Sequence, residues 1–149
     1  MEGTEFINYF AKIPVLLPYF KGVFSIDVMP QNLKNKCFFV SNLSPHNSQG
    51  THWIAFLCIN NCLEIFCSLG NTWDLIVPYL KFRKKFTIYY NETPFQSETS
   101  TKCGKYVIYY LIERHFNINM SLHDLLEDLF VTDDINKNDA IVEDFCNNL

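Results

Sequence analysis

The sequence of 149 residues has no long apolar run, no basic N-terminal segment followed by a cleavage site, and few charged residues. Without an apolar run of about 20 residues, a membrane-spanning helix is not expected. The missing leader argues against secretion. Charged residues make up 19% of the chain and hydrophobic residues 48%, which excludes a disordered protein. We therefore expect a single domain, residues 1–149, inside the cell and without membrane contact.

The cysteines also lack a pattern. The sequence has no CxxC pair and no Cys/His spacing of a zinc site, so no metal site is predicted. The cysteines are scattered and lie mostly in apolar runs, which favours free thiols in a reducing compartment. Disulfide pairing in a secreted protein is the alternative. The six positions are Cys37, Cys58, Cys62, Cys67, Cys103 and Cys146.

The net charge of −4 is unevenly distributed. Residues 1–121 hold 11 Lys and Arg against 8 Asp and Glu, whereas residues 122–149 hold one Lys against 8 acidic residues. This balance does not indicate nucleic-acid binding. One basic run is typical of a solvated helix end, where cations suit the helix dipole. A weak DNA contact is its functional alternative. The run comprises Lys81, Arg83, Lys84 and Lys85.

The pattern of apolar and turn residues predicts an α+β fold, with a central antiparallel sheet and helices mainly in the C-terminal half. Asn60 and Asn61 separate two apolar runs and favour a two-residue hairpin turn, because Asn tolerates positive φ. Residues 44–50 are expected to form a loop. The expected strands are 36–42, 53–59, 62–68 and 86–90, after an extended segment 20–30. The expected helices are 5–13 with Thr4 as a cap, 73–81, 103–116, 122–130 and 138–146.

The stretch 94–104 combines a candidate nucleophile with a hydrogen-bond donor. Cys103 begins an apolar helix for which Ser100 or Thr101 is the expected N-cap. At this end of a helix the dipole favours the nucleophilic thiolate. Gln96 lies seven residues earlier, and its amide can donate to an oxyanion at the same place. A nucleophile and a donor form half of an acyl-transfer site.

His52 is the candidate general base, at the entrance to the strand 53–59. If the hairpin turns at residues 60 and 61, Ile54 faces Cys67. His52 and Cys67 then share one side of the sheet as diagonal neighbours, about 7–8 Å apart. An orienting partner for the base is expected at this position, which holds a cysteine. Asn71 is a further candidate to orient the histidine. Taken singly, His52 and Cys103 also have a purely structural interpretation.

Three stretches occur together in an order that resembles the adenain-type cysteine proteases: Gly50-Thr-His-Trp53, the strand end 65–70, and Gln96 seven residues before Cys103-Gly104. The resemblance extends over about 90 residues, from Phe20 to Leu111. Through the segment 21–27 it is closest to the Maverick/Polinton and virophage proteases, and the SUMO-specific proteases are similar in the same core.

The resemblance implies a papain-like, adenain-like fold and the activity of a thiol protease, a hydrolase that acts in viral maturation. His52 would be the base, Cys103 the nucleophile and Gln96 an oxyanion donor, with Trp53 beside the site. The family has an acidic third residue where this chain has Cys67. The implied substrates are capsid or core precursors of a virus or mobile element, cut at Gly-rich sites.

The expected location is the virion and the cytoplasm or nucleus of the host, and the expected form is a monomer. The residues themselves predict no cofactor. The resemblance implies an activating peptide or DNA as an alternative. Cys67 leaves an alternative open, which is a weakened or inactive relative that acts as a protein-binding module. Cleavage of SUMO or ubiquitin ranks lower, because the short chain leaves little room for docking such a partner.

Overall fold

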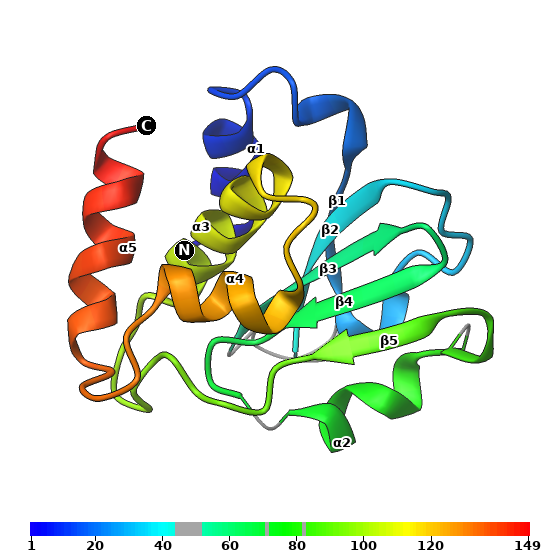
Figure 1. The fold of residues 1–149 in the computed structure, drawn as a ribbon. Helices are drawn as coiled ribbons and strands as arrows, with labels where there is room; N and C mark the ends of the chain where they lie inside the picture. Colours follow the sequence, from blue (N-terminus) through cyan, green and yellow to red (C-terminus); the bar gives the residue numbers. More distant parts are fainter. Residues whose placement is uncertain (44–51, 71, 82) are drawn as a thin grey trace.

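The computed structural model describes residues 1–43, 52–70, 72–81 and 83–149 and shows an α+β fold (Figure 1). No helix in these ranges is both long and apolar enough to cross a membrane. The described residues form one five-stranded sheet, in which the strands follow chain order: β1 (Phe20–Ser25), β2 (Cys37–Asn42), β3 (Trp53–Ile59), β4 (Cys62–Phe66) and β5 (Thr87–Tyr90). Their α-helices are α1 (Gly3–Phe10), α2 (Trp73–Ile76), α3 (Cys103–Phe116), α4 (Leu122–Leu129) and α5 (Lys137–Asn147). Short 3₁₀ helices cover Leu17–Tyr19, Ile26–Val28, Val77–Tyr79 and Arg83–Lys85.

The sheet is mixed, so the expected antiparallel arrangement holds for the three central strands and not for the two edge strands. Strand β3 pairs antiparallel with both β2 and β4, whereas β1 runs parallel to β2 and β5 runs parallel to β4. The link between β4 and β5 contains α2, and parallel neighbours need a crossover connection of this kind. The apolar pattern marks a strand but does not give its direction.

The β3–β4 hairpin forms as predicted. Asn60 and Asn61 have φ values of 50° and 62°, which is the left-handed conformation that a tight two-residue hairpin turn requires. Ile59 therefore pairs with Cys62, and the register continues to Ala55 opposite Phe66. This register determines which side chains lie on each face at the far end of the two strands.

The two faces of the sheet bury separate cores because side chains alternate along each strand. Ala55 and Leu57 of β3 pack with α1, α3, α4 and α5, which lie together on one face (Figure 1). Ile54 and Phe56 face the opposite core, to which α2 and the short helix after β1 contribute. The sheet therefore separates the layer that contains α3 from the layer that contains α2.

Two predicted helices end earlier than expected, each because of a proline. Helix α1 stops at Phe10, not Ile13, since Pro14 has no N–H to donate and clashes with the carbonyl four residues earlier. The first turn also begins before Thr4, with the Glu2 N–H bonded to the Glu5 carboxylate. Helix α2 becomes a 3₁₀ turn at Val77–Tyr79, which contains Pro78. The helices predicted at 103–116, 122–130 and 138–146 are present within one residue at each end.

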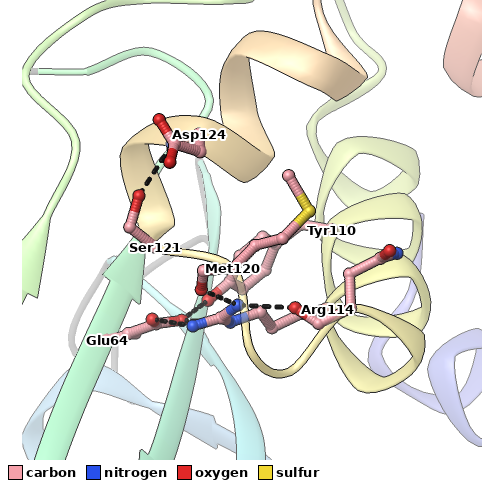
Figure 2. A network of polar contacts seen from close by, with 7 residues as sticks. Glu64, Tyr110, Arg114, Met120, Ser121 and Asp124 are labelled. Atoms are coloured by element: carbon pink, nitrogen blue, oxygen red, sulfur yellow. Dashed lines mark hydrogen bonds and ion pairs between the residues drawn. The ribbon is translucent and has the colours of Figure 1, made fainter.

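A buried ion pair joins β4 to α3 (Figure 2). Arg114 donates from Nε to Glu64 Oε2 at 2.9 Å and from Nη2 to Glu64 Oε1 at 2.5 Å. Tyr110 donates to the same carboxylate at 2.7 Å, and Arg114 Nη1 donates to the carbonyls of Asn117 and Met120. Glu64 and Arg114 are each 5% exposed. The pair is thus fully bonded and fixes α3 against the sheet.

Removing one partner of this pair should strongly destabilise the fold. Glu64→Ala or Arg114→Ala leaves an uncompensated buried charge, so the free energy of unfolding should fall by about 3–5 kcal/mol in urea titrations. Glu127→Ala is a control, because it removes only an exposed contact with His123 at 3.1 Å. That change should cost less than about 1 kcal/mol. Equal losses in the buried and exposed variants would refute this role of the pair.

Candidate active site

His52 and Cys67 meet where β3 begins and β4 ends. His52 directly precedes β3, Cys67 directly follows β4, and the distance from His52 Nε2 to Cys67 Sγ is 3.2 Å. Both residues are buried. The sequence predicted this proximity from the hairpin register, and the contact confirms it. A tautomer that donates from Nε2 to the sulfur leaves the lone pair of Nδ1 free to accept a proton.

Asn91 holds the backbone of Cys67 in place, and sequence analysis did not identify it. Its Oδ1 accepts the Cys67 N–H at 3.0 Å, and its Nδ2 donates to the Cys67 carbonyl at 2.6 Å. These bonds explain why β4 ends at Phe66 and not at residue 68. Gly70 completes the turn with a φ of 65°, and a Cβ there would collide with the Glu92 carbonyl.

The thiol of Cys67 lies among hydrogen-bond donors. Burial is the largest effect on the pKa of the Cys67 thiol and raises it above its ordinary value, and negative charge on Cys103 raises it further. The nearby Thr72 side chain and the backbone N–H groups of Leu69 and Gly70 act in the opposite direction and lower this pKa. The thiol is therefore neutral near pH 7. The same donors are suited to an acceptor with a full negative charge.

Cys103 is the first residue of α3, as predicted, and it is partly exposed. Its charge affects the pKa of Cys67, which places the two thiols within electrostatic reach of each other. The expected cap was wrong: Lys102 is the N-cap, and no side chain caps the helix. Ser100 instead accepts the Lys102 N–H at 3.2 Å and donates to Asp139 of α5 at 2.8 Å.

Hydrogen bonds to Ser68 and Ser100 hold Gln96 in one orientation. Its Oε1 accepts from the Ser68 hydroxyl at 2.5 Å, and its Nε2 donates to the Ser100 carbonyl at 3.0 Å. The backbone N–H groups of Phe95 and Gln96 both donate to the Ser68 carbonyl. An amide nitrogen has two hydrogens, so one remains for a further acceptor. Ser68, which sequence analysis did not identify, thus connects Gln96 to the end of β4.

Burial keeps His52 neutral at rest. Desolvation lowers its pKa from 6.5 to about 4, because burial disfavours the charged imidazolium. A resting thiolate–imidazolium pair, which helix position alone had suggested, is therefore disfavoured. A neutral imidazole still serves as a general base, since it takes the thiol proton as the thiolate attacks.

Replacing Cys67 by aspartate should raise the pKa of His52. A carboxylate near Nε2 favours the imidazolium, and an opposite charge at this distance typically shifts a pKa by about 1–3 units. The donors around position 67 should accommodate the charge. An NMR titration of the His52 ring in Cys67→Asp should place its midpoint above the value of about 4 expected for the native protein. The value of kcat/KM should also rise.

Cys67→Ala is the matched control for this substitution. It removes a weak hydrogen-bond acceptor and adds no charge, so the pKa of His52 and the turnover rate should change little. A large loss of turnover in Cys67→Ala, with the circular dichroism spectrum unchanged, would contradict the limited role assigned to the thiol.

The remaining predicted residues lie around this site or outside the described ranges. Trp53 follows His52, and its ring packs edge-on against Phe6 at 5.1 Å between centroids. Asn71 lies outside the described residues, as does the predicted loop 44–50. In the basic run, Lys81, Lys84 and Lys85 are exposed, and Arg83 begins a short 3₁₀ helix. Its contact with DNA remains a prediction.

All six cysteines are unpaired thiols in the structure. Within the described ranges, one group of side chains comes close enough together to hold a metal ion: His123, Asp124 and Glu127 on α4. All three are exposed, and the group lies outside the Cys–His arrangement. No protein-family model matches the chain, and no curated protein is significantly similar to it.

Proposed function

We propose that the protein is a cysteine endopeptidase with an adenain-like version of the papain-like fold. The observation that carries this proposal is the contact of 3.2 Å between His52 and Cys67, at the end of the sheet where α3 begins with Cys103. It supplies a base with an oriented ring, and Cys103 at the N-terminus of α3 lies within electrostatic reach of Cys67. Gln96, fixed by Ser68 and Ser100, supplies the donor that acyl transfer needs.

The proposed reaction has two halves. In the first, the Cys103 proton moves to His52 Nδ1 while the sulfur attacks the scissile carbonyl carbon. The resulting oxyanion accepts hydrogen bonds from Gln96 Nε2 and the Cys103 backbone N–H. The C–N bond then breaks, the amine leaves with the proton from His52, and a thioester remains. In the second half, His52 takes a proton from water as the hydroxide attacks the thioester carbon. The C–S bond then breaks, His52 returns the proton to the Cys103 sulfur, and the new carboxyl group is released.

The substrate is proposed to be a polypeptide. A hollow of about 990 Å³ opens beside Gln96, and its wall is formed by the turn after β4 and the loop before α3, including Leu69, Pro94 and Thr99. An extended chain can lie across such an open hollow. From the resemblance to viral maturation proteases, we infer that capsid or core precursors of a virus or mobile element are cleaved, at Gly-rich sites.

A peptide library from a digested proteome tests this function and presents many candidate sequences at once. The library is incubated with the protein, and new N-termini are mapped by mass spectrometry. Cleavage sites should contain glycine on the acyl side, and the Cys103→Ala protein should produce none. If both proteins leave the library uncut under reducing conditions, the protease proposal is wrong.

A second candidate function is a protein-binding module. This alternative is favoured by Cys67, which stands where the similar proteases have an acidic residue. Cys67 supplies no negative charge, and His52 has a pKa of about 4. Under this alternative Cys67→Asp stays inactive on the same library. Peptides would still be retained by the immobilised protein, and Cys103→Ala would retain the same ones.

A further inference from the structure

The first residues of the chain lie on the surface beside the candidate nucleophile. The Met1 carbonyl accepts a hydrogen bond of 3.0 Å from Trp53 Nε1, and Trp53 directly follows His52. The Met1 side chain lies against Gly104, which directly follows Cys103. Residues 1–3 therefore connect the two elements that supply the base and the nucleophile.

The absence of a side chain at Gly104 makes room for Met1. A Cβ built on Gly104 would lie 2.7 Å from Met1 Sδ and 3.0 Å from Met1 Cβ, so a side chain at position 104 would require the flexible Met1 side chain to shift. A Cβ built on Gly3 would lie 3.3 Å from Val23, which is a tight contact, and 3.8 Å from the Trp53 ring, which is an ordinary van der Waals contact. Trp53, Val23 and Gly104 thus form a surface that accepts a chain segment in close contact.

Helix α1 holds this segment in place. Phe6 is fully buried, and its ring packs against Trp53, so the helix, which begins at Gly3, is fixed beside the site. Met1 itself is 37% exposed. The segment is thus tethered close by but is held on the surface by few contacts. Tethering gives the segment a high effective concentration at this surface, so an incoming chain must compete with it.

We propose that the surface formed by Trp53 and Gly104 is a docking site for the polypeptide substrate, and that Met1–Gly3 occupies it in the free protein as an internal competitor. This inference rests on the proposed function, because the cleaved chain must lie next to both Cys103 and His52. The Met1 carbonyl shows the backbone contact that Trp53 offers, and Gly104 provides the space. The apparent affinity for substrate is then reduced by the fraction of molecules in which the surface is free.

The test compares alkylation of Cys103 by iodoacetamide in proteins released from an N-terminal fusion. Met1→Gly removes the side chain over Gly104 but keeps Glu2, which caps α1. Alkylation of Cys103 should become roughly three- to tenfold faster, as expected if the occupied state predominates. Met1→Leu is the matched control and should resemble the native protein, since its side chain fills a similar volume.

A synthetic peptide with the sequence of residues 1–4 provides a second arm. Added in excess, it should slow the alkylation of the Met1→Gly protein and affect the native protein less. In the native protein, the NMR signal of the Trp53 indole N–H should show protection from exchange that is lost in Met1→Gly. Equal alkylation rates in native, Met1→Gly and Met1→Leu proteins would overturn the proposal.

The variant Gly104→Ala distinguishes the effect of the internal competitor from the effect of the docking surface. The added methyl group displaces Met1, so alkylation should become faster, yet it also fills the docking surface, so library cleavage should become slower. If Cys103 is alkylated faster in Met1→Gly but the library is not cleaved, the result would support the docking surface and contradict the protease function. If the native protein cleaves the library but Met1→Gly is alkylated at the native rate, only the proposal that Met1–Gly3 is an internal competitor would be contradicted.

Discussion

Replacing His52 by alanine should lower kcat/KM by roughly 10⁴–10⁶-fold, the loss typical when the base of a catalytic unit is removed. The thiol of Cys103 would then have to lose its proton to water. We propose this role for His52 because its Nε2 contacts Cys67, which leaves Nδ1 as the nitrogen that can accept a proton. Steady-state assays on a peptide selected from the cleaved library would measure the effect.

His123→Ala is the control for the His52 substitution, because it removes an exposed histidine on α4. Its activity and its melting temperature should stay near those of the native protein. If His52→Ala retains more than a tenth of the native kcat/KM while remaining folded, His52 is not the base.

The second large effect is expected for Gln96→Ala, which should lower kcat by about 10²–10³-fold, the usual cost of losing one oxyanion donor. KM should change little, since the interaction is made mainly in the transition state. Alkylation of Cys103 should continue at the native rate, because iodoacetamide forms no oxyanion. A comparison of kcat, KM and the alkylation rate would show this combination.

Thr101→Ser is the control in the same loop, since Thr101 is exposed and lies outside the lining of the hollow beside Gln96. It should leave kcat, KM and alkylation unchanged. A small loss of kcat in Gln96→Ala would show that Gln96 is not a donor to the oxyanion. A parallel loss of alkylation would show that the substitution disturbs the loop, and Gln96→Glu would then test the donor with a side chain of the same shape.

Much of this arrangement could be predicted from local pattern. The two asparagines at 60 and 61 specify a tight turn, the turn specifies the register, and the register brings His52 to Cys67. Helix α3 could be predicted because its apolar residues recur with the helical period over four turns. In both cases the information lies in residues that are close in sequence.

The features that were missed depend on contacts between distant residues. Asn91 and Ser68 are ordinary polar residues in the sequence, and they acquire a role only when the strands bring them to residues 67 and 96. The direction of β5 depends on the path of the connection, not on its own sequence. The low pKa of His52 likewise comes from burial by the whole fold.

A peptide vinyl sulfone that ends in glycine tests the central claim most directly, because it alkylates only a thiol activated next to a peptide-binding site. Intact-mass analysis should show one adduct on the native protein, and peptide mapping should place it on Cys103. His52→Ala should form the adduct far more slowly. Adducts spread over several of the six cysteines, at rates that His52→Ala does not change, would contradict the assignment of Cys103 and His52 as a catalytic pair.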